Sequence, residues 1–151
     1  LMTYEWGYAY SAPMAVAPID KVEAVVNYAL TEIPAEKITM GVPNYGYDWP
    51  LPYVQGQTRA RSISNVAAVD LARRNKVEIK FDPVAMTPFF NYTADGQRHE
   101  VWFEDARSIE AKLDLATRKL LRGIAIWNIM RYFPALWLVL NGAWDIEDIP
   151  V

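Results

Sequence analysis

The sequence predicts an α/β fold in which three β/α units of a parallel barrel are interrupted by one small inserted α+β unit. At both ends of the chain, short apolar runs alternate with amphipathic helical segments, which is the pattern of parallel β/α units. In the middle, an Asp-Gly turn signal indicates an antiparallel hairpin instead. A complete (β/α)8 barrel takes about 250 residues. With 151 residues, the chain is expected to form part of a barrel.

Residues 1–8 are expected to form the first buried strand. Side chains alternate between the two faces of a strand, so Met2 and Tyr4 share one face. Thr3 and Glu5 share the other. A tyrosine and a carboxylate thus reach the C-terminal end of the strand, where parallel barrels place their site residues.

The next elements are a helix over 21–33 and an apolar strand over 38–42. Asp20 has the type of an N-cap residue, and Glu23 stands at the reciprocal position of a capping box. Pro34 is expected to stop the helix. Strand, helix and strand with short connections form a right-handed βαβ unit.

The following stretch, 45–56, is rich in Gly, Pro and aromatic residues and is interpreted as a loop, after which the pattern becomes α+β. The expected elements are a helix over 65–75 after Ser64, a half-exposed strand over 78–81, hairpin strands over 89–93 and 98–104, and a helix capped by Asp105 and stopped at Gly123. The expected inner faces are Val66, Val69, Leu71 and Ala72 on the first helix, and Ile109, Leu113, Ala116 and Leu120 on the second.

A last apolar strand over 124–127 precedes a closing helix that begins at Pro134, a residue suited to the first helical position. The domain prediction is therefore a partial barrel formed by 1–57 and 123–151. The α+β insertion occupies 58–122.

Composition limits the possible partners. The chain is 52% hydrophobic and 22% charged, as is usual for a globular domain. A net charge of −3 gives no basic patch for nucleic acid or anionic lipid, and no apolar run approaches the roughly 18 residues of a membrane span. With no cysteine and one histidine, disulfides, thiolate metal sites and a His-based triad are not expected. No metal or cofactor is predicted.

Three segments resemble glycoside hydrolase family 18, the family of chitinases and related N-acetylglucosaminidases. Met2-Thr3-Tyr4-Glu5 resembles its Met-x-Tyr-Asp strand, 41–47 looks like the next barrel strand, and 123–127 resembles the last strand, which ends in a sugar-stacking tryptophan. Residues 99–108 are similar to the insertion domain of the family. The resemblance covers essentially the whole chain and is closest to the branch that degrades spore-cortex peptidoglycan in spore-forming bacteria.

The resemblance implies the C-terminal part of a TIM (β/α)8 barrel, with its last three β/α units and a small α+β chitinase insertion domain. The family's signature, Asp-x-x-Asp-x-Asp-x-Glu, ends in the general acid and is absent from this sequence. The cluster at 145–148 has a different spacing and is interpreted as a solvated tail. The chain alone is therefore expected to be inactive, and a location outside the cell or in the spore coat or cortex is implied.

The resemblance also implies substrate-assisted retaining hydrolysis, in which the acetamido oxygen of the substrate attacks C1. Tyr4 would donate a hydrogen bond to that oxygen, and the alternative is a core tyrosine. Glu5 stands where the family has Asp and is one methylene longer. It would orient sugar hydroxyls or the acetamido N–H, and the alternative is a solvated strand end.

Trp127 would form the floor under the sugar ring, with a buried core tryptophan as the alternative. Further candidate substrate contacts are Tyr45, Tyr47, Asp48 and Trp49 after the second strand, and Met2 and Trp6 on the first. Ordinary packing is the alternative for Trp6 and Trp49. His99 is expected on the surface of the hairpin.

Two functions of different classes remain. The first is part of a glycosidase that cleaves β-1,4 bonds next to N-acetylglucosamine, in spore-cortex peptidoglycan or a chitin-like polymer. The second is a non-catalytic, lectin-like relative of the same family, because Tyr4 and Trp127 would serve binding as well as catalysis. A standalone interaction domain is disfavoured, since isolated parallel strands leave unpaired edges. We expect those edges to be covered by a missing N-terminal barrel half or by a second copy of the chain.

Overall fold

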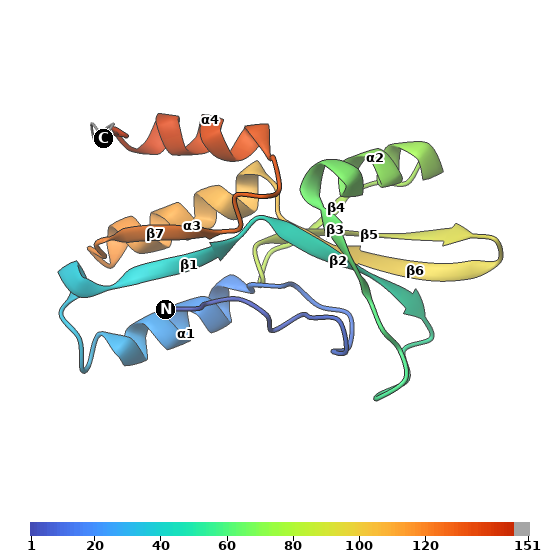
Figure 1. Cartoon of the computed structure of the whole chain (residues 1–151), viewed down its shortest axis with the longest axis horizontal. Helices are drawn as coiled ribbons and strands as arrows, with labels where there is room; N and C mark the ends of the chain where they lie inside the picture. The colour runs from blue at the N-terminus through green and yellow to red at the C-terminus, as the bar shows by residue number, and fades with distance from the viewer. Residues whose placement is uncertain (147–151) are drawn as a thin grey trace.

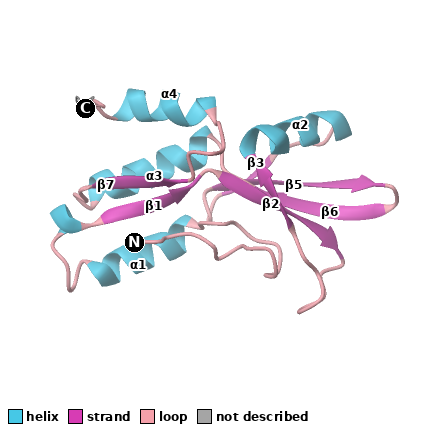
Figure 2. Cartoon of the chain, viewed as in Figure 1, coloured by secondary structure: helices cyan, strands magenta, loops and turns pink. Residues whose placement is uncertain are grey.

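The computed structural model describes residues 1–146 and contains two sheets with four α-helices (Figures 1 and 2). The elements in chain order are α1 (Ile19–Ala29), the 3₁₀ helix η1 (Ala35–Lys37), β1 (Thr39–Pro43), β2 (Tyr45–Leu51), β3 (Arg61–Ser64), α2 (Asn65–Asn75), β4 (Lys80–Asp82), β5 (Thr87–Ala94), β6 (Gln97–Trp102), α3 (Ala106–Arg118), β7 (Gly123–Trp127) and α4 (Pro134–Ala143). The fold is mixed α/β with a large antiparallel sheet, and Figure 2 shows the two parts side by side.

One part is built on the parallel pair β1–β7, whose register runs from Thr39 opposite Gly123 to Pro43 opposite Trp127. The helices α1, α3 and α4 gather around it (Figure 1). Its buried core consists of Ala17, Val22, Val26, Met40, Val42, Ile109, Leu113, Leu115, Ala116, Phe133, Leu136 and Leu140. The apolar runs predicted as strands at 38–42 and 124–127 are confirmed, and they are neighbours in space.

The N-terminal segment lies along the other edge of β1 without forming a regular strand. The amino group of Leu1 donates to the Thr39 carbonyl at 2.7 Å, and Gly41 N–H donates to the Leu1 carbonyl at 2.8 Å. The buried Thr3 hydroxyl then caps the Gly41 carbonyl. The prediction of a strand over 1–8 is wrong because Glu5 adopts a positive φ of 71°, which breaks the extended backbone.

The other part is the antiparallel sheet, with strand order β3-β2-β6-β5-β4. The predicted hairpin is confirmed: Ala94 pairs with Gln97, and Asp95 and Gly96 take φ of 50° and 77°, as a two-residue turn with both central residues left-handed requires. The loop expected over 45–56 is wrong, because β2 occupies most of it and pairs with both β3 and β6. The expected strand over 78–81 lies slightly later, at Lys80–Asp82.

The bounds of α2 are confirmed, and Ser64 caps it by accepting a hydrogen bond from Ala67 N–H. The prediction of its inner face is confirmed for Leu71 and Ala72, which pack in or against the sheet core, and is wrong for the two valines. Val66 and Val69 are exposed, whereas Ala68 and Ala72 are buried against the sheet core. Small side chains allow this short helix to approach the aromatic-rich sheet closely, so size rather than hydrophobicity decides the buried face.

The cap of α3 is confirmed: the Asp105 carboxylate accepts a hydrogen bond from Ser108 N–H, and the Ser108 hydroxyl oxygen accepts one from Asp105 N–H. The helix ends at Arg118, earlier than the predicted stop at Gly123. Leu120 is exposed and left-handed, with φ of 53°, and it stops the helix ahead of Gly123. Burial of Ile109, Leu113 and Ala116 is confirmed.

The start of α1 also differs. Pro18 is the N-cap residue and no side chain caps the helix, so Asp20 lies in the first turn, where its charge still favours the helix dipole. The helix ends at Ala29, before the predicted Ile33. For α4 the prediction of Pro134 at the first helical position is confirmed. The acidic cluster at 145–148 falls partly outside the described residues.

The chain passes between the two parts twice: β1 runs through Asn44 directly into β2, and β6 leads back into α3 (Figure 1). The helix α3 contributes Ile109, Leu113, Leu115 and Ala116 to the core of the parallel pair, while β2 belongs to the antiparallel sheet. The domain division at residues 57 and 122 stays a prediction.

Candidate functional site

Glu5 lies between two tyrosine hydroxyls at the junction of the two parts. Tyr45, the first residue of β2, donates a hydrogen bond to Glu5 Oε1. The Tyr47 hydroxyl donates to the same oxygen at 3.1 Å. Because β2 alternates its side chains, Tyr45 and Tyr47 share one face and can both reach the carboxylate. The left-handed backbone of Glu5 directs its side chain to this point.

A hollow of about 160 Å³ opens above this carboxylate. It is lined by Glu5, Tyr45, Tyr47, Ser62, Trp127, Asn128 and Arg131. Four of the candidates taken from the sequence therefore meet at one place: the Glu5 carboxylate, the two β2 tyrosines and Trp127. The indole of Trp127, at the end of β7, is 55% exposed and available to a ligand.

Burial and the adjacent carboxylate keep the two hydroxyls protonated. Burial is the largest cause that raises the pKa of Tyr47, to about 12, and the charge and hydrogen bond of Glu5 add to it. The pKa of Tyr45 is also raised, by burial first and then by its bond to Glu5. Both side chains therefore act at neutral pH as hydrogen-bond donors to the Glu5 carboxylate.

Asn44 fixes the segment that follows β7. Its backbone N–H donates to the Trp127 carbonyl at 3.0 Å, and its side-chain oxygen accepts from Asn128 N–H at 2.9 Å. Its amide Nδ2 donates to the Arg131 carbonyl, also at 2.9 Å. The peptide bond between Trp127 and Asn128 is cis. One buried side chain thus holds the wall of the hollow in place.

Arg131 supplies the positive charge of the site. Its guanidinium donates to the Ser62 hydroxyl at 2.9 Å and lies 5.6 Å from the centre of the Tyr45 ring. Sequence reasoning missed Asn44, Ser62 and Arg131 as site residues. For Asn44 a signal existed, since it is a polar residue directly after a buried strand, where barrels place functional groups. Nothing local in the sequence marks Ser62.

Tyr4 is half-buried beside this cluster. Its ring lies against β1, so closely that a Cβ added to Gly41 would come within 2.7 Å of Tyr4 Cε1. Tyr4 does not line the hollow, and its ring packs against the core of the parallel pair.

The remaining sequence candidates lie elsewhere. Trp49 is fully buried, and its indole N–H donates to the Ser11 carbonyl at 2.8 Å. In this chain it is a core residue. Trp6 packs against the core of the parallel pair. Met2 is 82% exposed but does not line the hollow.

Asp48 and His99 form a separate polar group on the opposite face of β2. His99 Nδ1 lies 2.8 Å from Asp48 Oδ1, and the Tyr92 hydroxyl donates to Asp48 Oδ2 at 2.7 Å. The rings of Tyr92 and His99 are stacked with centres 4.7 Å apart. The expectation of His99 as a simple surface residue is therefore wrong, because the hairpin register turns it toward Asp48.

Within residues 1–146, no group of three or more His, Asp or Glu side chains is placed to hold a metal ion. In the same range, none of the helices is both long and apolar enough to cross a membrane.

The Glu5 carboxylate, held by two tyrosines, thus lies next to an exposed tryptophan at the end of the parallel strands. The chain belongs to the glycosyl hydrolases family 18, whose family model matches residues 1–131. The resemblance noted from three short segments is thereby confirmed.

The particular relatives are lytic enzymes of the bacterial spore cortex. The chain is 52% identical over 147 residues to the cortical fragment-lytic enzyme of Bacillus subtilis (strain 168). The alignment covers 97% of this chain and 34% of that enzyme. Crystal structures of the spore cortex-lytic enzyme SleL from Bacillus cereus and Bacillus megaterium superpose with TM-scores of 0.94 and 0.91, at 46% and 48% identity. Each superposition covers 97% of this chain, and 34% and 33% of the respective relative. The chain thus spans about one third of the length of these relatives.

Proposed function

We propose that the chain is the C-terminal part of a family 18 glycosidase barrel that acts on N-acetylglucosamine-containing polysaccharide, with spore-cortex peptidoglycan as the substrate. The observation that carries this proposal is the Glu5 carboxylate held by Tyr45 and Tyr47 beside the exposed indole of Trp127. The family membership and the cortex-lytic relatives support it. We also propose a location outside the cell, or in the spore coat or cortex, which the cortex-lytic relatives support.

In this proposal the pair β1–β7 belongs to the barrel, with the N-terminal segment along the edge of β1, and the strands β3 to β6 belong to the inserted α+β domain over 58–122. The Trp127 indole forms the floor under one sugar ring. A stacked aromatic face favours a flattened, positively charged sugar in the transition state. We assign to the Tyr4 hydroxyl a hydrogen bond to the acetamido oxygen of the substrate, a role that rests on the family resemblance, since Tyr4 does not line the hollow.

The role assigned to Glu5 is to position the substrate, not to donate a proton to it. Its carboxylate already accepts hydrogen bonds from both β2 tyrosines, so it is suited to accept further bonds from the acetamido N–H or a sugar hydroxyl. The acetamido oxygen itself attacks C1, as in substrate-assisted hydrolysis with retention. The general acid belongs to the Asp-x-x-Asp-x-Asp-x-Glu motif, which these 151 residues lack. The chain alone therefore binds the glycan without cleaving it.

The lectin-like alternative uses the same residues. It is favoured by one observation: among residues 1–146, Glu5 is the only carboxylate that lines the hollow, and both β2 hydroxyls are directed to it. The two functions differ at the general-acid position of the full-length protein. A glutamate at the end of that motif makes the parent a hydrolase, and its replacement makes the parent a sugar-binding protein.

Binding of N-acetylglucosamine oligomers to the chain, measured by isothermal titration calorimetry, tests the proposal. Trp127→Ala should weaken binding by roughly 0.5–1.5 kcal/mol, which is up to about tenfold in Kd. Trp137→Ala is the matched control, since Trp137 is a similarly exposed tryptophan on α4 that does not line the hollow. An equal loss in both variants, or no binding by the unaltered chain, would contradict the proposal.

Hydrolysis is assayed on the same oligomers. We expect no release of N-acetylglucosamine by the chain alone, and turnover that persists through repeated purification would show that a general acid exists among these residues.

A further inference from the structure

The hollow above Glu5 holds one negative and one positive side chain. Among residues 1–146, Glu5 and Arg131 are the only charged residues that line it. The aromatic rings of Tyr45, Tyr47 and Trp127 line it as well. A carboxylate next to aromatic faces is by itself suited to a cationic ligand, because an ammonium group is attracted both to the carboxylate and to the π-faces. What the hollow accepts therefore depends on Arg131.

Arg131 is held in place from two sides. Its backbone carbonyl accepts a hydrogen bond from the Asn44 side-chain amide at 2.9 Å, and its guanidinium donates to the Ser62 hydroxyl, also at 2.9 Å. The guanidinium carbon lies 5.6 Å from the centre of the Tyr45 ring. The positive charge of Arg131 thus occupies an aromatic face that a ligand cation would otherwise use.

The charge of Arg131 also acts on the tyrosine pair that holds Glu5. Burial and Glu5 raise the pKa of Tyr47, and the charge of Arg131 lowers it. The Tyr47 hydroxyl in turn donates to Glu5 Oε1 at 3.1 Å. None of the ion pairs found among residues 1–146 joins Glu5 to Arg131, so both groups can contact a ligand that enters the hollow.

The two charges distinguish an amide from an ammonium group. An amide can donate its N–H to the Glu5 carboxylate and accept a hydrogen bond from the Arg131 guanidinium, so it uses both groups. An ammonium group is attracted by Glu5 and repelled by Arg131, and it offers no acceptor to the guanidinium. Amino sugars carry an amide when they are N-acetylated and an ammonium group when they are not.

We propose that Arg131 is a specificity-determining residue of the Glu5 hollow, which excludes amino sugars with a free ammonium group and thereby favours their N-acetylated forms. This inference rests on the proposed function and adds a residue that sets its selectivity. It assigns the discrimination to the charge of Arg131, on the segment after β7, and not to the size of the hollow.

Calorimetric titration with two tetrasaccharides tests the inference. The probes are the N-acetylglucosamine tetramer, which the unaltered chain should prefer, and the glucosamine tetramer. The pH is about 5.5, between the ordinary pKa values of a carboxyl group and an amine. Arg131→Gln should bind the glucosamine tetramer about fivefold more tightly than the unaltered chain does, the effect expected of one partly exposed charge pair.

The same variant should bind the N-acetylglucosamine tetramer more weakly, because the amide loses its donor. A loss of structure would weaken the binding of both tetramers, so effects of opposite sign identify a role in selectivity. The gain for the glucosamine tetramer should shrink as salt screens it. Arg131→Lys keeps the positive charge and should keep the preference for the N-acetylglucosamine tetramer, although it lacks the planar fork.

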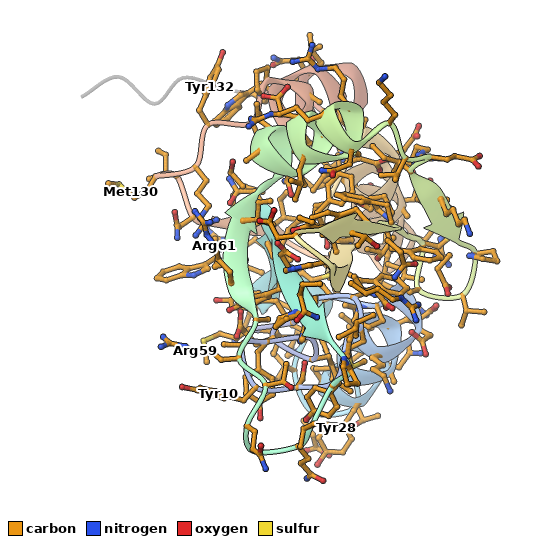
Figure 3. The ribbon with its side chains drawn as sticks, turned by 90° about the vertical axis from the view of Figure 1, so that its right-hand side faces the viewer. Tyr10, Tyr28, Arg59, Arg61, Met130 and Tyr132 are labelled. Carbon is orange, nitrogen blue, oxygen red and sulfur yellow. The ribbon has the colours of Figure 1, made fainter. Side chains whose placement is uncertain are left out.

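Arg61→Gln is the matched control. Arg61, labelled in Figure 3, precedes Ser62 on β3 and does not line the hollow. Its replacement changes the net charge of the chain by the same amount as Arg131→Gln. Any general attraction of the glucosamine tetramer to a chain of net charge −3 is therefore equal in the two variants.

Glu5→Gln tests the balance from the other charge. It leaves Arg131 as the only charged group that lines the hollow among residues 1–146, so the affinity for the glucosamine tetramer should fall about fivefold. In Glu5→Gln/Arg131→Gln both charges are removed, and that affinity should return toward the value of the unaltered chain.

Changes of the same sign for the two tetramers in Arg131→Gln would overturn the inference and leave the proposed function intact. A gain for the glucosamine tetramer that Arg61→Gln reproduces, or an unchanged affinity of Glu5→Gln for this tetramer, would do the same. Absence of binding of both tetramers to the unaltered chain would overturn both the inference and the proposed function.

Discussion

The antiparallel sheet and the parallel pair differ in how fully they satisfy their own edges and faces. The sheet has five strands and one helix, and its core of Ala68, Ala72, Phe90, Tyr92, Val101 and Phe103 is closed. The pair β1–β7 has three helices but only one regular ladder, and among the described residues no strand adds to the free edge of β7. The antiparallel sheet therefore has a core of its own, whereas the parallel pair leaves one strand edge without a partner among the described residues.

Exposed apolar side chains follow the same division. After β7, Ile129, Met130 and Tyr132 are largely exposed, and Figure 3 shows Met130 and Tyr132 projecting away from the body of the molecule. The chain spans about one third of its relatives, and in the proposed function the rest of the barrel would cover this surface. The candidate site lies at the border of the two regions and takes residues from both.

The largest expected effect is at Glu104, which contacts residues of both regions. Its fully buried carboxylate accepts from Lys112 Nζ on α3 at 2.9 Å, and its backbone N–H donates to Asn65 on α2. Lys112→Met leaves that carboxylate buried without a partner and should cost about 3–5 kcal/mol of stability. Urea unfolding measures the loss.

The control for this variant is Lys112→Met/Glu104→Gln, which removes both charges and should recover most of the loss. The pH dependence has a definite sign. Burial raises the pKa of Glu104 and Lys112 lowers it, so removing Lys112 raises it further. Below the raised pKa of Glu104 in the unaltered chain the carboxyl is protonated in both folded proteins, so the penalty should be small there and should grow as pH rises through that pKa. A penalty independent of pH would contradict this account.

Gly46→Ala attacks the antiparallel region alone. A Cβ at Gly46 would lie 2.1 Å from the Trp102 carbonyl oxygen and 2.6 Å from Phe103 Cα, so β2 and β6 would have to separate. We expect a loss of about 1–3 kcal/mol, seen as faster amide exchange in β2 and β6. Gly142→Ala, with nothing within 4 Å of the added Cβ, is the control and should be neutral or slightly stabilising. Equal effects of the two substitutions would contradict the register.

Self-association of the chain tests whether the parallel region has an uncovered surface. At micromolar concentration the chain should run larger than a monomer in gel filtration with light scattering, because the parallel region has an open edge and exposed apolar groups. Met130→Ser/Tyr132→Ser should shift it toward the monomer, while Val66→Ser/Val69→Ser on the exposed side of α2 should not. A well-folded, strictly monomeric chain would argue against the partial barrel.

The smallest expected effect is a titration at the border. Tyr47 should ionise near pH 12, because burial and then Glu5 raise its pKa. Its contribution to stability is therefore present below pH 10 and lost as pH rises toward 12. Glu5→Gln should lower the pKa of Tyr47, as followed by the absorbance of ionised tyrosine, and Glu100→Gln, a carboxylate paired with Trp102, should not. An unchanged Tyr47 in Glu5→Gln would contradict the site geometry.

The sequence predicted regular elements well where local chemistry decides them. The Asp95–Gly96 turn, the Asp105 cap and the strands at 39–43 and 123–127 all carry their signals within a few residues. It failed where a distant partner decides. Tyr45–Leu51 resembles a loop in composition, and only pairing with β6 makes it a strand.

The candidate site shows the same limit. Glu5, Tyr45, Tyr47 and Trp127 could be named from their positions at strand ends, and they meet in one hollow. Ser62, Arg131 and the contact of His99 with Asp48 depend on how β2 packs against β3 and β6, which no local pattern encodes. Trp49 is of a residue type that often contacts sugars, but the pairing of β2 with β3 and β6 leaves it buried.

The passage of one backbone through Asn44 from β1 into β2 makes the site sensitive to parity. Strand faces alternate with every residue, so inserting or deleting one residue between Pro43 and Tyr45 would turn both tyrosines away from Glu5 and direct Gly46 and Asp48 toward it. The tip at Asp95–Gly96 has no such constraint, since added residues there lengthen the hairpin without reversing β2. Related proteins can therefore vary freely in hairpin length, while the count of residues from β1 to Tyr47 has to stay fixed for the tyrosine clamp to survive.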